Sequence, residues 1–412
     1  MGDGHEPYGA TGTARDGTGV GNSRAPVEYD PFSPAVQADP YPVYRRLRDD
    51  APVHHNAERD LWSLSRYDDV SRASRDWRTF STAEGSDPDY VGKVLGLNGF
   101  LDLDPPRHDE LRKLVFDVFA PAAIAALEPE VTRQADALID ALAERDEADL
   151  ARQFAAIFPL GVVSHVLGVP HADGPDLMRL VFRCYEPSPF ELTDSVNEAR
   201  LALRAYFSDA LDDRRQGPRN DVLTRLAAAR TSADADLEEV LDICLLLFTA
   251  GYVTTAGLLG TALHELALHP TDRSALRAQP GRWPQAVEEF LRFDAPVQLL
   301  ARTVRTDVTL HGTTIPAGAR VLLLYASANH DERQFPDPER LDLTRPDNRH
   351  LSFGEGIHRC LGSTLARLEG RVGLRRVVER LPDYELAGPV SRTMSAVSRE
   401  IVSLPVAFER RS

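Results

Sequence analysis

The sequence contains little cysteine and no long apolar run, and both shortages limit the kind of protein it encodes. Only 3 of its 412 residues are cysteine, and they lie far apart. An odd number of scattered cysteines argues against a disulfide framework and suits a reducing compartment. There is no signal sequence with a basic start and an apolar core, and no run of about 18 apolar residues. We therefore expect a cytoplasmic protein with no membrane span.

Basic residues are also scarce relative to acidic ones. The chain has 47 Lys and Arg against 63 Asp and Glu, which gives a net charge of −16. Such a chain repels nucleic acid and anionic lipid, so neither is an expected partner. It lacks the Cys-x-x-Cys and His-x-x-x-His spacings of zinc sites. No Gly-x-Gly-x-x-Gly follows a predicted strand, so we expect no flavin or nicotinamide domain within it.

The chain contains neither an internal repeat nor a long linker beyond residue 27. Residues 1–26 are rich in glycine and almost free of apolar side chains, so they cannot bury enough surface to offset the entropy lost on ordering. They predict a disordered leader. Residues 27–412 predict a single domain, expected to be monomeric.

Apolar periodicity predicts a mainly α protein with small β-sheets, of the α+β class. A helix is expected in residues 39–48, followed by a hairpin of Val53–His55 and Leu61–Ser65. Further helices are expected at Glu110–Phe119, Pro129–Glu144, Leu150–Leu167, Val196–Gln216, Asp221–Ala228, Leu237–Leu268, Trp283–Phe293 and Leu361–Glu379. Later strands are expected at Val308–Leu310, Arg320–Tyr325, Tyr384–Leu386 and Ile401–Phe408.

One cysteine stands in a loop rich in glycine just before a predicted helix. Residues 353–362 read Phe-Gly-Glu-Gly-Ile-His-Arg-Cys-Leu-Gly, with the cysteine at position 360. Glycines permit tight turns and close approach by a bulky group, and a helix start favours the ionised thiolate that binds metal. The alternative is a small buried cysteine in an ordinary turn.

This order of residues resembles the haem-ligand loop of the cytochrome P450 family, in which a cysteine thiolate is the axial ligand of haem iron. The resemblance implies a P450-like fold that holds haem b between the long central helix and the helix after the cysteine. It makes Cys360 the iron ligand and places Phe353, Gly354, His358 and Gly362 at the cofactor. Cys184 and Cys244 are expected to be ordinary core or surface thiols.

The middle of the predicted helix Leu237–Leu268 contains residues that favour helix poorly. Gly251 costs roughly 1 kcal/mol relative to alanine, and two threonines follow it at positions 254 and 255. A flat cofactor against the helix would explain the glycine, and so would close packing against another helix. The resemblance makes Gly251, Thr254 and Thr255 catalytic-site residues, with Thr254 delivering protons. Similar proteins carry Asp or Glu directly before the first threonine, whereas this chain has Val253.

Several cationic side chains match family positions that bind the haem propionates. His108 and Arg112 lie four apart on one helical face, and Arg302, His350 and His358 complete the expected set. Carboxylates that are half buried need charge-assisted donors of this kind. On a surface, the same His-x-x-x-Arg spacing would be an ordinary solvated face.

A second charged set matches the family's structural lock. Glu289 and Arg292 form a Glu-x-x-Arg pair, and Arg345 is the arginine expected to join them. Because buried charges persist only when paired, these residues are expected to be structural rather than catalytic.

The resemblance implies a monooxygenase that inserts one oxygen atom of O₂ into a small or medium, largely apolar molecule, in secondary metabolism or catabolism. Its electrons would come from a ferredoxin and a ferredoxin reductase, which would dock near Arg107, Lys113, Arg359 and Arg367. Val253 keeps open other haem-thiolate reactions, namely oxidative coupling, desaturation or oxidation driven by peroxide. A haem sensor without catalysis is a third class. The resemblance also predicts a substrate pocket in the loop of residues 94–101 and further along the chain, formed by Val94, Leu95, Leu97, Phe248, Ala250, Val253, Val297, Leu299, Leu300, Met394 and Val397.

Overall fold

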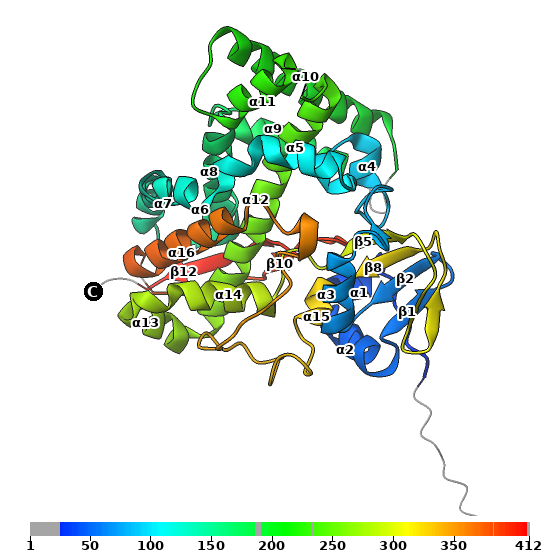
Figure 1. Ribbon diagram of the computed structural model, residues 1–412. Helices are drawn as coiled ribbons and strands as arrows, with labels where there is room; N and C mark the ends of the chain where they lie inside the picture. Colours follow the sequence, from blue (N-terminus) through cyan, green and yellow to red (C-terminus); the bar gives the residue numbers. More distant parts are fainter. Residues whose placement is uncertain (1–24, 186–190, 233, 382, 410–412) are drawn as a thin grey trace, which may run out of the picture.

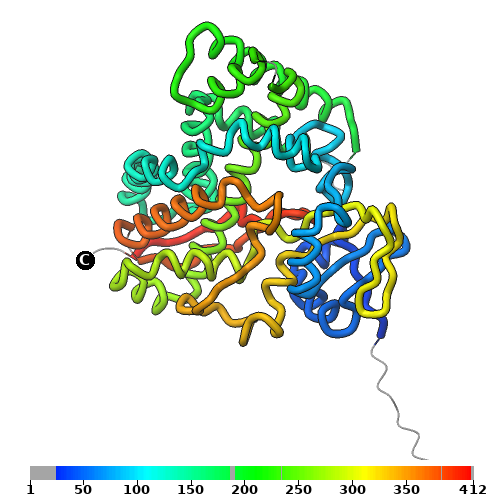
Figure 2. The backbone as a smooth tube through the Cα atoms, viewed as in Figure 1, coloured from blue at the N-terminus to red at the C-terminus, as the bar shows by residue number. Residues whose placement is uncertain are grey.

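The computed structural model describes residues 25–185, 191–232, 234–381 and 383–409. In these residues a large helical region surrounds one long helix, α12, and a smaller region built on a β-sheet lies beside it (Figure 1). Figure 2 shows segments from the start of the chain, in blue, beside segments near residue 310, in yellow. Residues 1–24, most of the predicted leader, lie outside the described residues. The observed class is mainly α with small sheets, as predicted.

The helical region contains most of the helices that the periodicity predicts. Its members are α5 (Arg107–Phe116), α6 (Pro121–Ala126), α7 (Glu128–Ala143), α8 (Ile157–Leu167), α9 (Gly174–Cys184), α10 (Asp194–Gln216), α11 (Val222–Thr231), α12 (Leu237–Leu268), α13 (Pro270–Ala278), α14 (Trp283–Phe293) and α16 (Ser363–Arg380). Short helical turns connect them at η1 (Gly99–Asp102), η2 (Asp117–Phe119), η3 (Ala151–Ala155), η4 (Pro280–Arg282) and η5 (Gly356–His358).

The main sheet joins strands that are distant in the sequence. Its order is β1 (Val53–Asn56), β2 (Leu61–Leu64), β8 (Arg320–Leu323), β5 (Leu300–Val304) and β3 (Phe80–Ser81). The predicted hairpin forms β1 and β2, and β2 then pairs in parallel with β8, with Leu61 opposite Arg320. Helices α1 (Pro34–Ala38), α2 (Tyr41–Asp50), α3 (Tyr67–Arg75) and α15 (Tyr325–Ala328) lie near this sheet in Figure 1.

Smaller sheets lie at the edges of the fold. One has three strands, in the order β4 (Glu147–Asp149), β12 (Pro405–Phe408) and β9 (Tyr384–Leu386). Two others are pairs, made by β6 (Val308–Leu310) with β7 (Thr313–Ile315) and by β10 (Ser391–Arg392) with β11 (Ile401–Ser403). A short helix, α4 (Val91–Leu95), precedes η1.

Helix α12 begins and ends at the predicted residues because both ends carry strong signals. The Asp236 carboxylate accepts a bond of 2.9 Å from the Glu239 N–H, and the Glu239 carboxylate accepts one of 3.0 Å from the Asp236 N–H. This reciprocal capping box satisfies two donors at the helix start, and Pro270 follows its end. Among the described helices, α12 is long and apolar enough to cross a membrane, but 78% of its apolar window is buried in the protein. It is a core helix of roughly 48 Å.

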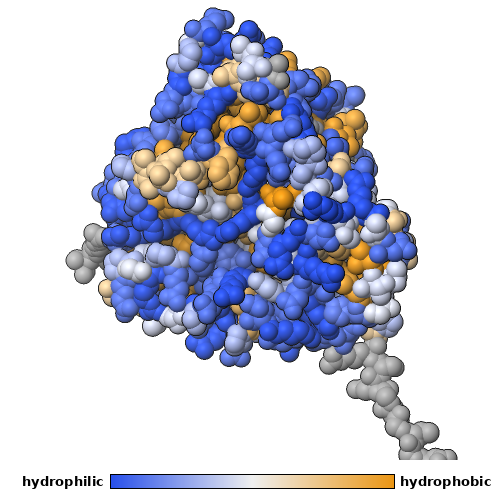
Figure 3. Space-filling view, in the orientation of Figure 1, coloured by the Kyte–Doolittle hydropathy of each residue, from blue (hydrophilic) through white to orange (hydrophobic). Residues whose placement is uncertain are grey.

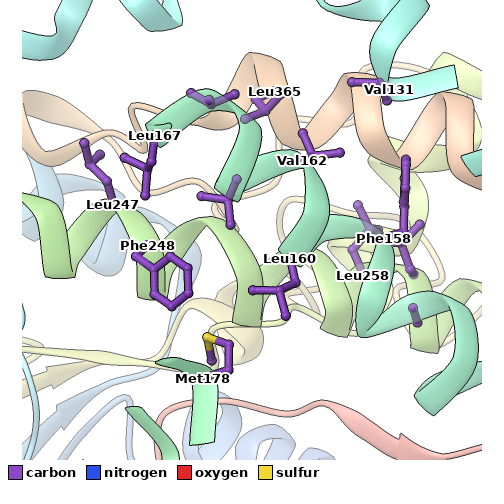
Figure 4. Packing of buried hydrophobic residues seen from close by; sticks show 14 of the residues in the cluster. Val131, Phe158, Leu160, Val162, Leu167, Met178, Leu247, Phe248, Leu258 and Leu365 are labelled. Carbon is purple, nitrogen blue, oxygen red and sulfur yellow. The ribbon is translucent and has the colours of Figure 1, made fainter. Parts of the chain in front are cut away.

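The largest apolar core forms where α12 meets its helical neighbours. Phe248 and Leu258 of α12 pack with Phe158, Leu160 and other apolar residues of α8 (Figure 4). On another side, the Phe248 ring meets that of Phe207 in α10 with centroids 6.0 Å apart. Burying one such side chain contributes about 1.5–3 kcal/mol. This packing fixes the position of α12, and with it the residues that face the site described below.

Several predicted boundaries differ from the structure for local reasons. The predicted helix Leu150–Leu167 contains a π-helical turn, η3, before α8 begins at Ile157. The predicted strand Arg320–Tyr325 ends at Leu323, since Tyr325 begins α15. The predicted strand Ile401–Phe408 divides at Leu404, because its halves join different sheets. The helix predicted from Leu361 begins two residues later, at Ser363.

Candidate active site

The loop before α16 is folded by two glycines in the left-handed region. Gly354 has φ +61° and Gly356 has φ +70°, which side chains rarely adopt. A Cβ atom on Gly356 would also lie 2.7 Å from the carbonyl oxygen of Ser74, so that position requires glycine for a second reason. The Phe353 carbonyl accepts a bond of 2.8 Å from the Cys360 N–H, which closes the loop. The backbone of this loop thus fixes the position of Cys360.

Gly362 differs from the expectation of a tight turn. Its φ is −80°, which any residue can adopt, and a Cβ atom there would meet no heavy atom within 4 Å. Instead, Gly362 is the N-cap of α16 and lines a cavity. The missing side chain leaves open space beside the cysteine, where a bulky group could lie flat.

The accessible surface of Cys360 faces this cavity, and protein atoms surround the residue on its other sides. Burial among protein atoms raises the pKa of its thiol above the ordinary value, while the Gly362 N–H and the guanidinium groups of Arg112, Arg367 and Arg359 act in the opposite direction. Coordination to a metal ion removes a thiol proton outright. The donors around the sulfur therefore favour a bound thiolate.

The other two cysteines lie neither in a glycine-rich loop nor beside the cavity. Cys184 and Cys244 are buried, and burial raises the pKa of Cys184 to about 11 and that of Cys244 further above its ordinary value. Neither lines the cavity. They are core thiols, as the sequence predicted for non-ligands.

The cavity encloses about 1450 Å³, including the space at its mouth. The part of this space that a water-sized sphere can enter is about 230 Å³. One wall is α12 and the opposite wall is the Cys360 loop with the start of α16. The lining is mainly apolar, and its α12 members are Leu246, Leu247, Ala250, Gly251, Thr254, Thr255 and Leu258.

These α12 residues recur at the spacing of one helical face. The Thr254 hydroxyl donates a bond of 3.0 Å to the Ala250 carbonyl one turn earlier, which leaves its oxygen free to accept a bond from the cavity. Val253 does not line the cavity and packs against the apolar core. Val253 therefore presents no side chain to the cavity.

The position of Gly251 is compatible with both explanations offered for it. It lines the cavity, and a Cβ atom at this position would lie 2.6 Å from Cγ2 of Val163 in α8. Crowding by α8 is the contact that the structure shows, so helix packing alone would require a glycine here.

Two arginines, Arg302 buried and Arg112 half-buried, face the cavity without a carboxylate partner in the described residues. Arg302 donates 2.7 Å to the Ala301 carbonyl, and Arg112 donates 2.7 Å to the Arg359 carbonyl. Both line the cavity. Because buried charge normally persists only when it is paired, these guanidinium groups fit an anionic ligand between them.

Two histidines stand beside the arginines. The ring centroids of His108 and His358 are 4.6 Å apart, and His358 lines the cavity while His108 lies behind it. His108 Nε2 and His358 Nδ1 are buried without a hydrogen-bond partner. Burial lowers the pKa of both rings, that of His358 well below its ordinary value. Unsatisfied buried nitrogens are rare, and the carboxylates of a haem fit this donor set.

His350 does not join this cluster. Its Nε2 lies 3.2 Å from the Glu288 carboxylate, its ring contacts that of Phe353, and it does not line the cavity. Phe353 itself lines the cavity and lies under the guanidinium of Arg367 at 4.3 Å. The expectation that His350 binds a propionate is therefore not supported, because an ion pair already holds its ring elsewhere.

The predicted structural cluster of Glu289, Arg292 and Arg345 is present outside the cavity. Glu289 is fully buried and accepts bonds of 2.8 Å from Arg292 and 3.1 Å from Arg345. Asn348 and the Asp342 N–H each add a bond of 2.8 Å. All of these groups lie outside the cavity, which fits a structural role.

The predicted pocket residues are divided between the cavity and the rest of the fold. Ala250, Val297 and Leu300 line it, as do Phe100 and Leu101 of the predicted 94–101 loop. The other predicted members do not: Leu95, Leu97, Phe248 and Leu299 are buried in the core, Val94 and Met394 are exposed, and Val253 and Val397 pack against core clusters. The sequence analysis missed Leu246, Leu247 and Glu369, and also Val163, Val166 and Leu167 of α8.

Of the four cations expected to form a docking patch for a ferredoxin, two are in ion pairs with acidic residues. Arg107 pairs with Glu239 and Glu110, and Arg367 pairs with Glu288. Lys113 and Arg359 are exposed. On the face shown in Figure 3 most residues are hydrophilic, with hydrophobic residues in separate patches.

Comparison with known proteins agrees with this geometry. A family model described as Cytochrome P450 matches residues 283–383. Cytochrome P450 130 of Mycobacterium tuberculosis is 39% identical over 363 residues, which are 85% of this chain and 90% of the relative. Vitamin D(3) 25-hydroxylase of Pseudonocardia autotrophica is 37% identical over 400 residues, covering 93% and 98%.

Solved structures show the same fold. The bacillaene polyketide synthase cytochrome P450 PksS of Bacillus subtilis has a TM-score of 0.86 and 30% identity, covering 93% of this chain and 100% of that one. The chain belongs to the cytochrome P450 family of monooxygenases.

Proposed function

We propose that the protein binds haem b between α12 and α16, with the Cys360 thiolate as the axial ligand, and hydroxylates a small or medium apolar molecule. The observation that carries this proposal is the position of Cys360, which opens into an apolar cavity opposite Ala250 and Thr254. When bound, haem supplies the activation of O₂ and the insertion of one oxygen atom into the substrate.

The chain's own residues would hold the haem by its edge and its faces. Arg112, Arg302 and His358 would donate to the propionates, with His108 supporting His358 from behind. This assignment is supported by two guanidinium groups without carboxylate partners and two imidazole nitrogens without hydrogen bonds, within the described part of the chain. Phe353, Gly354 and Gly362 would line the proximal side.

Thr254 would hold and pass protons on the substrate side. Its hydroxyl lines the cavity and already donates to the Ala250 carbonyl, so it can accept a proton and release another through the same oxygen. Thr255 lies beside it on the cavity wall. Removing the hydroxyl in Thr254→Ala should uncouple electron use from product and release hydrogen peroxide.

The part of the substrate that contacts the apolar lining of the cavity would be uncharged. Phe100, Leu101, Leu247, Val297 and Leu300 present hydrocarbon to the cavity, and the cationic groups that line it are already assigned to haem. A relative named for hydroxylating vitamin D(3) supports hydroxylation. Epoxidation and O-dealkylation are the related outcomes of the same oxygen transfer.

Electrons would reach the site from a ferredoxin and its reductase in the cytoplasm, with residues 27–412 acting as a single monomeric domain. The docking surface would centre on Lys113 and Arg359, the exposed cations of the predicted patch that form no ion pair within the described residues. An acidic ferredoxin would complement these charges, and association should weaken as salt is raised.

The ligand assignment is tested by the absorption spectrum of the reduced protein with carbon monoxide. Cys360→Ala should lose the thiolate-type band, whereas Cys184→Ala and Cys244→Ala should keep it. A band retained in Cys360→Ala would exclude Cys360 as the ligand. Product formation with a ferredoxin and reductase then tests the enzyme activity itself.

Val253 supports a second candidate, oxidation driven by peroxide or another haem-thiolate reaction with a different demand for protons. An apolar side chain cannot relay a proton, and this one does not reach the cavity. Turnover with hydrogen peroxide should then exceed turnover with ferredoxin and reductase on the same substrate. The reverse order favours O₂-dependent hydroxylation.

A further inference from the structure

Arg367 of α16 is one of the cations expected to dock a ferredoxin, but the structure gives it other partners. Its Nε donates a bond of 2.7 Å to Oε1 of Glu288 in α14, and its Nη2 donates one of 2.8 Å to Oε2. Its guanidinium carbon lies 4.3 Å from the centre of the Phe353 ring. A bidentate pair fixes an arginine in direction as well as in distance. Arg367 is therefore held over an aromatic ring that lines the cavity.

His350, which lies outside the propionate cluster, belongs to this one. The Ser352 N–H donates a bond of 3.2 Å to its Nδ1, so in the neutral ring Nδ1 has the lone pair and Nε2 has the hydrogen. Oε2 of Glu288 accepts that hydrogen, with 3.2 Å between the two heavy atoms. Burial lowers the pKa of His350, which keeps the ring neutral. The Glu288 carboxylate is thus held by Arg367 on one helix and by His350 at the start of the Cys360 loop.

The ring under Arg367 belongs to the residue that closes the loop around the sulfur. The Phe353 carbonyl accepts the bond from the Cys360 N–H, and both residues line the cavity. Burial raises the pKa of Cys360, and Arg367 is among the guanidinium groups that oppose this effect, so its charge acts at the sulfur. Burial also acts on Glu288, but the bonds from Arg367 and His350 outweigh it and hold the pKa of Glu288 at about 2. Both members of the ion pair are therefore charged at neutral pH.

We propose that Arg367 is a positioning residue that raises the reduction potential of haem iron at Cys360 by the charge it holds over Phe353. Glu288 opposes this effect, and His350 keeps the carboxylate in place. The one electron of the reduction comes from an external donor of the ferredoxin class and goes to the iron. Arg367, Glu288 and His350 exchange neither electrons nor protons. This inference rests on the proposed haem site.

The direction of the effect follows from the signs of the two charges. Reduction adds an electron, so a nearby positive charge favours the reduced state and a nearby negative charge disfavours it. A unit charge about 10 Å away changes an equilibrium constant roughly tenfold or more at an effective dielectric constant of about 20. The Arg367 side chain is 35% exposed, so solvent and salt screen part of its charge. We expect a shift of at most about tenfold in the equilibrium constant of reduction, which is about 59 mV for a one-electron couple.

A second ion pair on α16 provides a matched control. Arg371 lies one turn after Arg367 and binds the Glu128 carboxylate through bonds of 2.9 Å and 2.8 Å. The exposure of its side chain, 30%, is similar. The two pairs differ mainly in the stacking of Arg367 on Phe353, the ring that borders the cavity.

The first test is a potentiometric titration of the haem-loaded protein at neutral pH without substrate. Arg367→Met should lower the potential, whereas Glu288→Gln should raise it while keeping a carbonyl oxygen for Arg367 and His350. The double variant should lie close to the parent, because both charges are gone. Arg371→Met and Glu128→Gln should also stay near the parent. A merely structural disturbance would shift both single variants in the same direction. That result, or shifts no larger than those of the control pair, overturns the proposal.

The second test measures the charge at the sulfur through carbon monoxide bound to the reduced protein. A positive charge draws electron density from the thiolate, so less reaches the carbon monoxide and its stretching frequency increases. The infrared band should therefore rise in frequency in Glu288→Gln and fall in Arg367→Met. Where Arg367→Met does not retain haem, Glu288→Gln decides alone, and an unchanged band and potential in it overturn the proposal.

The same complex separates this inference from the proposed function. If the parent protein gives no thiolate-type band with carbon monoxide, the proposed haem site fails, and this inference fails with it. If the parent gives that band and the variants of Arg367 and Glu288 do not differ from it in potential, the haem site stands and only the proposed effect of Arg367 fails.

Discussion

Replacing Glu289 by glutamine should destabilise the fold more than any surface charge change. Glu289 is fully buried and holds both Arg292 and Arg345 through its carboxylate. In Glu289→Gln the two guanidinium groups keep their carbonyl partners, among them those of Asn329 and Pro336, but lose their only negative charge. Removing one member of a buried ion pair costs about 3–5 kcal/mol, out of a total stability of roughly 5–15 kcal/mol.

The measurement is urea unfolding of the haem-loaded protein followed by circular dichroism. A matched control is Glu110→Gln, which removes the carboxylate 2.7 Å from Arg107 at the surface and should cost about 0–1 kcal/mol. The reasoning is refuted if Glu289→Gln lowers the free energy of unfolding by no more than the control does. Such a result would mean that the carbonyl oxygens alone stabilise the arginines.

Three further predictions concern the site and its support. Gly251→Ala should cost about 1–3 kcal/mol in thermal unfolding by overpacking against Val163, and adding Val163→Ala should recover most of this loss; no recovery would place the clash elsewhere. Gly356→Ala should speed haem transfer to an acceptor apoprotein, because a Cβ atom collides with the backbone of α3; an unchanged rate would contradict this. The Arg367 guanidinium and other partners lower the pKa of Glu288 to about 2 from 4.5, so its contribution to stability is complete above pH 4.5 and is lost as pH falls toward 2, and an acid titration of Glu288→Gln should show a shallower loss than that of the parent.

The features of the fold that depend on local signals could be predicted from the sequence. The bounds of helix α12 could be predicted to the residue because Asp236 caps its start and Pro270 follows its end. Strand β5 was missed because its identity depends on pairing with β8 and β3, which no local pattern reveals. At Leu404 the chain passes from one sheet to another, but this residue lies within an apolar run, so no local pattern marks the end of β11 and the start of β12.

Site residues that belong to a motif could be predicted from the sequence. Those whose role depends on whether the side chain faces the cavity or the core could not. The glycine-rich loop before α16 identified Cys360, and the Glu-x-x-Arg pattern identified the buried ion pair of Glu289 and Arg292. Helix α12 is apolar on most of its faces, so periodicity could not show that Leu247 faces the cavity while its neighbour Phe248 packs against α10. Glu369 could have been noticed as an acid within the apolar spacing of a helix, but only the fold shows that it borders the cavity.

The parallel pairing of β2 with β8 has a consequence for how the protein is made. Leu61 and Arg320 are partners in the sheet, so β2 emerges from the ribosome about 260 residues before the strand that covers its edge. At about 5–20 residues per second, β2 waits roughly 13–52 s for that partner. Throughout this interval the β1–β2 hairpin presents an open edge to other chains, which makes the early part of synthesis the stage at which a chaperone would matter most.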